Sequence, residues 1–98
     1  MDHSTFTQLA AKEIDYLYES IESKLIDIDI DLISDVLYIY TDKGDYVINQ
    51  HSPSKQIWLS SPVSNASYFD YDSDNKQWIN KQKYSIRSIL SLDLNITL

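Results

Sequence analysis

Six acidic side chains, in two groups of three, have the types and spacing that could support chemistry. The first three would fall within an arc of roughly 60° on a single helix, at 100° per residue. The second three alternate with apolar residues, so on a strand they would share one face, with neighbours about 6.8 Å apart. Carboxylates without His or Cys favour hard cations, and open spacing predicts weak binding of a mostly hydrated ion. The predicted site comprises Asp15, Glu19 and Glu22 on the helix and Asp27, Asp29 and Asp31 on the strand.

A plainer interpretation of the same residues remains open. The helical carboxylates would then be an ordinary solvated face. The strand carboxylates would protect an exposed edge from pairing with other chains. Composition alone does not separate this interpretation from a cation site.

Hydrophobic periodicity places the first group on a helix over residues 4–25. Apolar residues recur every three or four positions, which is the stripe of an amphipathic helix, and Ser4 is the predicted N-cap. The period then changes to strict alternation over 26–32, which predicts a strand with one buried face. The helical stripe consists of Phe6, Leu9, Ala10, Ile14, Leu17, Ile21 and Leu25.

The rest of the chain is predicted to be mostly strands. A turn at 34–35 precedes a strand over 36–41, and a loop at 42–45, with Gly44 at positive φ, precedes a third strand over 46–49. A strand over 55–60 and a hairpin of 68–71 with 77–80 follow, and a closing helix begins at Ser85. This order predicts one domain over residues 1–98, an α+β two-layer sandwich. Both terminal helices would cover one face of a five- to six-stranded antiparallel sheet.

Charge and composition narrow the partners and the compartment. The formal net charge is −7 and the pI about 4.4, which disfavours nucleic acid and favours cations or basic protein surfaces. The sequence has no cysteine, so thiolate sites and disulfides are excluded. No apolar run is long enough for a membrane span, and no secretory or transit signal precedes the helical pattern. We therefore expect a cytoplasmic protein.

Catalytic patterns are weak. His3 lies near the chain start, and His51 falls in a predicted polar loop. Neither a nucleophile elbow nor a phosphate-binding glycine loop occurs. An open acidic face does not provide the pocket that would separate two carboxylate pKa values for acid–base work. We expect no enzyme and no catalytic residue.

The strand over 55–60 carries a second candidate surface. Alternation places Ile57 and Leu59 on the helix-covered face and Gln56 and Trp58 on the other. Trp58 should therefore lie largely on the solvent side, where an exposed Trp among amides is typical of a protein-binding hot spot. The alternative is that the following loop shields Trp58. Trp78 shows no such signal and is expected to be structural.

These residues carry a resemblance to a known family. The segment from Tyr46 to Pro62 reads YVINQHSPSKQIWLSSP and closely resembles the central signature of the frataxin family. The preceding amphipathic helix, the acidic alternating segment and the YFDY run before Gln77 and Trp78 are also similar, so the match covers nearly the whole chain.

The resemblance implies a frataxin fold and weak binding of Fe²⁺ and Fe³⁺ along an acidic ridge. It also implies contact with a cysteine desulfurase and an iron–sulfur scaffold protein during cluster assembly. By position, Asn49, Gln56 and Trp58 match the sheet residues that make this contact. Where many mitochondrial relatives carry a basic residue before the fifth strand, this chain has Ser67-Tyr68, which puts one charged contact in doubt.

Three functions remain as hypotheses at this stage. The first is an iron-binding accessory protein of cluster assembly that acts as a monomer, whereas an iron-dependent oligomer would favour the second. The second is iron storage or detoxification by oligomerisation, with weak ferroxidation. The third is a regulator that binds only proteins. The lack of a presequence resembles a bacterial frataxin, and a mitochondrial or related organellar form is the alternative.

Overall fold

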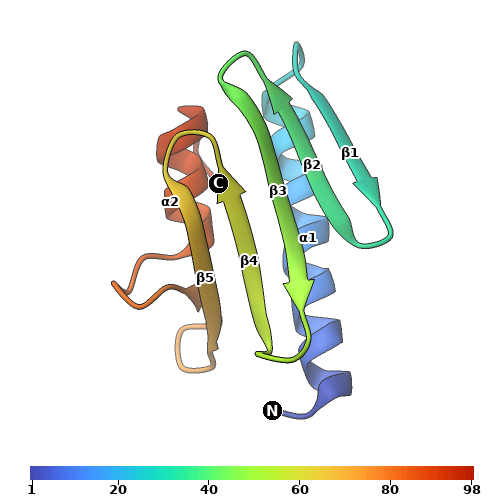
Figure 1. Cartoon of the computed structure of the whole chain (residues 1–98), viewed down its shortest axis with the longest axis vertical. Coiled ribbons are helices and arrows are strands. Elements are labelled where there is room, and N and C mark those ends of the chain that lie inside the picture. Colours follow the sequence, from blue (N-terminus) through green and yellow to red (C-terminus); the bar gives the residue numbers. More distant parts are fainter.

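The structure, a computed structural model, describes all residues from 1 to 98, and its elements follow the predicted order of helix, strands and helix (Figure 1). They are α1 (His3–Lys24), β1 (Asp29–Ile33), β2 (Val36–Thr41), β3 (Gly44–His51), β4 (Gln56–Ser61), β5 (Asn65–Asp72), β6 (Gln77–Ile79) and α2 (Ile86–Leu94).

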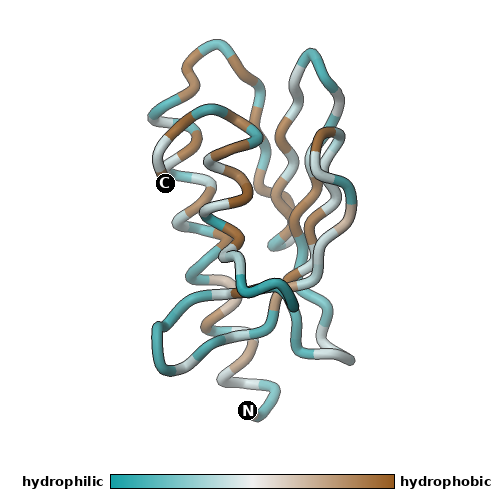
Figure 2. The backbone as a smooth tube through the Cα atoms, turned by 90° about the vertical axis from the view of Figure 1, so that its left-hand side faces the viewer, coloured by the Kyte–Doolittle hydropathy of each residue, from teal (hydrophilic) through white to brown (hydrophobic).

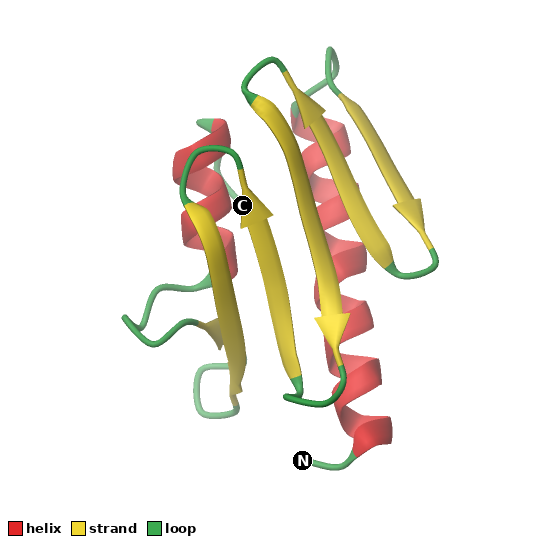
Figure 3. Cartoon of the chain, in the orientation of Figure 1, coloured by secondary structure: helices red, strands yellow, loops and turns green.

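The six strands form one antiparallel sheet in sequential order from β1 to β6. Both helices lie behind this sheet in the view of Figure 3, so its other face is uncovered and turned toward the reader. The side view in Figure 2 shows the two layers edge-on. The predicted two-layer α+β sandwich is therefore confirmed. We call the uncovered side the open face.

The core lies between the helices and the sheet. Alternation along β2, β3 and β4 turns one set of apolar side chains toward the helices, where the stripe of α1 covers them. Tyr46, Ile48, Ile57 and Leu59 point inward as predicted, and Trp78 is buried. The fifteen buried core residues are Phe6, Ala10, Ile14, Leu17, Ile21, Leu37, Ile39, Tyr46, Ile48, Ile57, Leu59, Phe69, Trp78, Ile86 and Leu90.

The start of α1 differs from the prediction of a Ser4 N-cap. Asp2 caps the helix instead, because its extended backbone lets Oδ1 accept a 2.7 Å hydrogen bond from the amide of Thr5. Ser4 lies inside the first turn, where its carbonyl accepts from the Thr7 hydroxyl at 3.0 Å. The helix thus begins one residue before the predicted range.

The first strand is also shorter than the alternation of 26–32 predicted. β1 begins only at Asp29, and the residues before it form the turn that brings the chain from α1 to the sheet edge. Ile26, which the alternating pattern would bury, is 86% exposed, whereas Leu25 and Ile28 pack against the core. The alternating pattern therefore extends beyond the strand. In the turn Ile28 still packs against the core but Ile26 does not, and Asp27 lies in the turn, not on the strand.

Tight turns join the first three strands near the predicted positions, but β3 begins at Gly44, so the second turn is shorter than the predicted loop over 42–45. Ser34 and Asp35 both have positive φ (51° and 64°), the conformation of the two-residue turns that suit the twist of antiparallel strands. Gly44 has φ of 130°, and a Cβ there would lie 2.8 Å from Cβ of Pro62. Glycine is therefore required at this position both for its backbone and for the close approach of the next hairpin.

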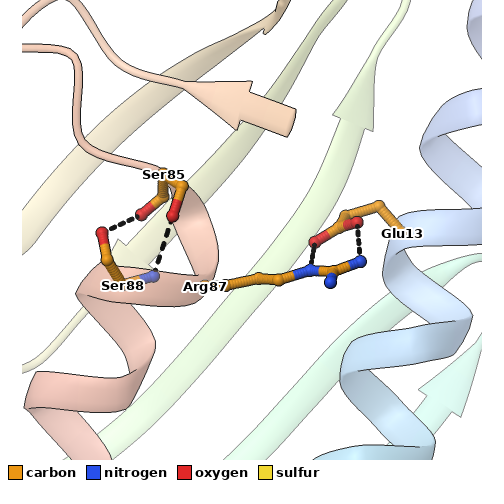
Figure 4. A network of polar contacts seen from close by, with 4 residues as sticks. All are labelled: Glu13, Ser85, Arg87 and Ser88. Atoms are coloured by element: carbon orange, nitrogen blue, oxygen red, sulfur yellow. Dashed lines mark hydrogen bonds and ion pairs between the residues drawn. The ribbon is translucent and has the colours of Figure 1, made fainter. Parts of the chain in front are cut away.

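One buried ion pair joins the two helices and was not predicted. Glu13 on α1 is only 8% exposed, and its carboxylate accepts two 2.9 Å hydrogen bonds from Nε and Nη2 of Arg87 on α2 (Figure 4). The guanidinium also lies 3.7 Å from the ring centroid of Tyr16. At the start of α2, Ser88 donates two hydrogen bonds to the N-cap Ser85, from its amide to the Ser85 hydroxyl at 3.1 Å and from its hydroxyl to the Ser85 carbonyl at 2.8 Å (Figure 4).

Replacing Arg87 by Met should destabilise the fold. The Glu13 carboxylate would be left buried without a partner, which costs roughly 3–5 kcal/mol for a fully buried pair. Because the Arg87 side chain is 40% exposed, we expect about 2 kcal/mol here. Urea unfolding measures this loss, and the double variant Glu13→Leu/Arg87→Met should recover most of it. A double variant as unstable as the single one would contradict the role of an uncompensated carboxylate.

Candidate functional site

The acidic ridge consists of six carboxylates on α1, on the edge strand β1 and in the turn between them. α1 runs behind β2 and β3 and is next to β1 (Figure 1). All six side chains are exposed. Three lie on α1, one in the turn between α1 and β1, and two on β1. In that order they are Asp15, Glu19 and Glu22, then Asp27, then Asp29 and Asp31.

The carboxylates of β1 point to the open face of the sheet. Along this strand the exposed residues Asp29 and Asp31 alternate with the half-buried Ile30 and Leu32. Asp29 is paired with Tyr40 of β2, and Asp31 with Tyr38. Cross-strand partners share a face, so each carboxylate lies beside a tyrosine on the open side.

Tyr18 shows that the two parts of the acidic ridge are neighbours. It lies on α1 between the acidic residues and the core stripe. The pKa of its hydroxyl is raised, first by hydrogen bonding to the Glu22 carboxylate and further by the negative charge of Asp31. A side chain of α1 is therefore within electrostatic reach of carboxylates from both elements, consistent with the packing of α1 next to β1.

No basic side chain neutralises this surface. The only ion pair between side chains in the protein is that of Glu13 with Arg87, on the side of α1 that faces α2. The ridge carboxylates also do not converge, since no three His, Cys, Asp or Glu side chains are placed to share one ion. The arrangement can attract hydrated cations or basic groups, but it does not form a preformed cage.

The second predicted surface, Asn49, Gln56 and Trp58, lies on β3 and β4. Asn49 is directly opposite Trp58 in the register of these strands, and all three residues are half-buried. Trp58 lies on the open face as predicted, but it is not largely exposed. His51 stacks on its indole at 3.7 Å between ring centroids, and Tyr68 meets it edge-on at 5.1 Å.

Hydrogen bonds also hold Trp58 in place. Its Nε1–H donates to Oε1 of Gln56 at 3.0 Å, and Nε2 of Gln56 donates to Asp70 at 3.1 Å. The shielding therefore comes from side chains on the neighbouring strands. The predicted alternative, cover by the following loop, is not what the structure shows. Gln56 acts as a support for the indole orientation, and the half-buried ring is fixed in one position.

Two residues of this surface are not predicted by local sequence patterns. His51 ends β3 and does not lie in the predicted polar loop, and its Nδ1 lies 2.6 Å from the Ser54 hydroxyl. Tyr68 begins a predicted strand, but nothing in its local sequence links it to Trp58. Its pairing with Trp58 follows from the β4–β5 register, which the sequence does not contain as a local pattern.

Comparison with known proteins decides the family. A family model described as "Frataxin-like domain" matches residues 1–98. The chain belongs to the frataxin family. Among curated relatives, the mitochondrial frataxin of Arabidopsis thaliana is 39% identical over 85 residues, 81% of this chain and 46% of the relative. That of Dictyostelium discoideum is 45% identical over 58 residues, 58% of this chain and 30% of the relative.

Solved frataxins share the fold of this chain. The frataxin of Psychromonas ingrahamii superposes with a TM-score of 0.83 at 28% identity, covering 96% of this chain and 89% of that one. A trimeric frataxin of Saccharomyces cerevisiae, complexed with ferrous iron, gives a TM-score of 0.79 at 31% identity, covering 89% and 82% of the two chains.

This frataxin-family chain spans less than half the length of the two curated relatives. The relatives include both bacterial-type and mitochondrial frataxins. Neither of the two helices has the length and apolarity to cross a bilayer.

The pKa of Tyr18 provides a direct test of the ridge geometry. Glu22→Gln removes the largest cause of the raised value, so the hydroxyl should titrate at lower pH, closer to its ordinary pKa. Asp31→Asn should lower the pKa less, because Asp31 acts only through its charge. NMR titration of the tyrosine ring carbons measures both, with Asp74→Asn in the β5–β6 loop as control. An unchanged Tyr18 titration in Glu22→Gln would show that the helix carboxylate lies elsewhere.

Proposed function

We propose that this protein is an iron-binding accessory protein of iron–sulfur cluster assembly. The observation that carries the proposal is the acidic ridge of a frataxin-family chain, whose exposed carboxylates on α1 and β1 have no basic partner. In this role the ridge binds Fe²⁺ and Fe³⁺ weakly, and the protein contacts a cysteine desulfurase together with a scaffold protein. Iron is cargo in this function, and the chain contributes no catalytic residue.

The chemistry of the ridge supports weak and exchangeable binding of iron. Carboxylate oxygens are hard ligands that suit Fe²⁺ and especially Fe³⁺ better than soft metals. Because no three carboxylates converge, an ion at the ridge keeps most of its water and leaves easily. Easy release is what a protein that passes iron onward needs. The yeast relative solved with ferrous iron supports the choice of metal.

Two surfaces support the protein contacts. The ridge, in a chain of net charge −7, attracts the basic surface of a desulfurase over a distance of about 10 Å at moderate salt. The group of Asn49, Gln56 and Trp58 offers a fixed indole bordered by amides for contact with the scaffold. Tyr68 lies edge-on to Trp58 and extends the aromatic part of this surface.

Iron storage by oligomerisation is the second candidate, favoured by the trimeric state of the yeast relative. Size-exclusion chromatography of the iron-loaded protein separates the two functions. The accessory role predicts a monomer at all iron levels up to saturation of the ridge, whereas storage predicts iron-dependent assemblies.

Ferrous iron should broaden a defined set of amide signals. In an anaerobic NMR titration, we expect selective paramagnetic broadening at 15–22 and 27–31, because these segments carry the ridge carboxylates. Asp31→Asn should weaken the effect about two- to threefold, in line with the loss of one carboxylate contact near the surface. Asp74→Asn changes net charge equally but lies in the β5–β6 loop, so it should leave the titration unchanged. Uniform broadening, or equal effects of both variants, would favour the role that involves only protein partners.

Trp58→Ala should weaken binding to the desulfurase–scaffold complex by about 2 kcal/mol, the loss typical of a hot-spot aromatic. The fold should persist, because Trp58 is outside the buried core. Isothermal titration with the assembled complex measures the first effect and circular dichroism checks the second. The matched control is Tyr84→Ala, an aromatic that is 61% exposed on the loop before α2. Equal losses in both variants would remove Trp58 from the contact.

A further inference from the structure

A hollow on the helix side of the molecule gathers positive charge in an otherwise acidic protein. Its volume is about 210 Å³, and its walls come from α1, α2 and the β5–β6 hairpin. Three of the eight lysines and arginines of the chain line it, one from each of these elements: Lys12, Arg87 and Lys76. Glu13 is the only acidic residue in its wall. Neither the ridge nor the Trp58 surface uses this hollow.

The ion pair of Glu13 with Arg87 leaves two positive charges in the hollow without a counterion. The carboxylate accepts from Nε and Nη2 of Arg87, whereas Nη1 makes no hydrogen bond within the protein and is turned away from Glu13 (Figure 4). Lys12 and Lys76 are both exposed, and neither forms an ion pair. An anion that enters the hollow therefore meets one oriented guanidinium nitrogen and two free ammonium groups.

The guanidinium is held in a fixed plane before any ligand arrives. The Tyr16 ring lies 3.7 Å from it, and the two hydrogen bonds to Glu13 fix its rotation. The pKa of Arg87 is raised, first by hydrogen bonding to Glu13, so the group stays charged. A planar guanidinium suits the oxygens of a phosphate, and lysine binds phosphate as a point charge. This set of donors fits a phosphate group better than a singly charged carboxylate.

The size of the hollow limits the ligand. Pockets for drug-sized ligands have roughly 300–1,000 Å³, so about 210 Å³ suits a molecule with one or two phosphate groups and not a whole nucleotide. The negative charge of the whole protein, −7, disfavours general binding of anions. Binding of a phosphate must therefore come from the local arrangement of the three basic groups.

We propose that this hollow is a binding site for a small phosphate compound. The bound phosphate bridges Lys12 on α1, Arg87 on α2 and Lys76 in the β5–β6 loop, and so stabilises the packing of the two helices. The site lies on the helix side of the sheet, away from the open face. It therefore adds to the proposed function a ligand that can be bound together with iron or with a protein partner.

Pyrophosphate titrated into the iron-free protein tests the proposal. Ionic strength is held constant with sodium chloride, so that screening does not change during the titration. Amide NMR shifts should be confined to 9–16, 75–78 and 86–88, and the midpoint of thermal unfolding should rise with pyrophosphate concentration. Orthophosphate should bind less tightly, and glycerol 3-phosphate, run in parallel, separates a phosphate ester from the free anion as the ligand. Shifts no larger than those caused by acetate would overturn the proposal.

A pair of matched variants separates the hollow from general attraction to lysines. Lys12→Gln/Lys76→Gln leaves the Glu13–Arg87 pair intact, so the fold should persist while pyrophosphate binding weakens about three- to tenfold. Lys24→Gln/Lys43→Gln removes the same charge at the end of α1 and in the β2–β3 turn, and should leave binding unchanged. Equal weakening in both variants would contradict a site in the hollow. The ferrous titration of the first variant should match that of the unmodified protein, so this result is independent of iron binding at the ridge.

Discussion

The burial of the apolar stripe of α1 against the sheet is the constraint on which both candidate surfaces depend. Phe6, Ile14 and Leu17 are fully buried, and each such side chain contributes about 1.5–3 kcal/mol. Two unit charges 6.8 Å apart in water repel each other by only about 0.6 kcal/mol. The packing of the helix therefore outweighs the repulsion among the ridge carboxylates. The same packing orients the carboxylates of α1. They project outward beside β1, because the side of α1 that carries Glu13 faces α2.

The two sides of the sheet carry different kinds of side chain. The covered side is filled by aliphatic and aromatic side chains, while the open side carries aromatics that support one another across strands. His51, Trp58 and Tyr68 come from three adjacent strands, and their stacking covers part of the indole without a second layer. A ring held in this way loses little rotational freedom when a partner binds, which lowers the entropic cost of contact.

Sequence patterns predicted most of the fold, because periodicity reports directly which face of an element is buried. The stripe of α1, the inward residues of β3 and β4, and the turn at Ser34 and Asp35 all follow from local spacing. Local spacing fails where an alternating pattern continues from a strand into a turn, as at Ile26 and Asp27, which precede β1. It also cannot show contacts between distant segments. Glu13 and Arg87 are 74 positions apart, and each taken alone resembles an ordinary surface charge.

The ridge and the Trp58 surface are not independent, because β2 and β3 connect them on the open face. Asp31 and Tyr38 lie in one row with Val47, and Asn49, next on that side of β3, leads to Trp58. A partner broad enough to cover Trp58 therefore also approaches the carboxylates of β1. Charge acts over about 10 Å and orients the approach, whereas the indole acts only at contact. In the proposed function, long-range attraction by the carboxylates of β1 and short-range contact at Trp58 of β4 would let one face attract a basic partner and then hold it in a single orientation.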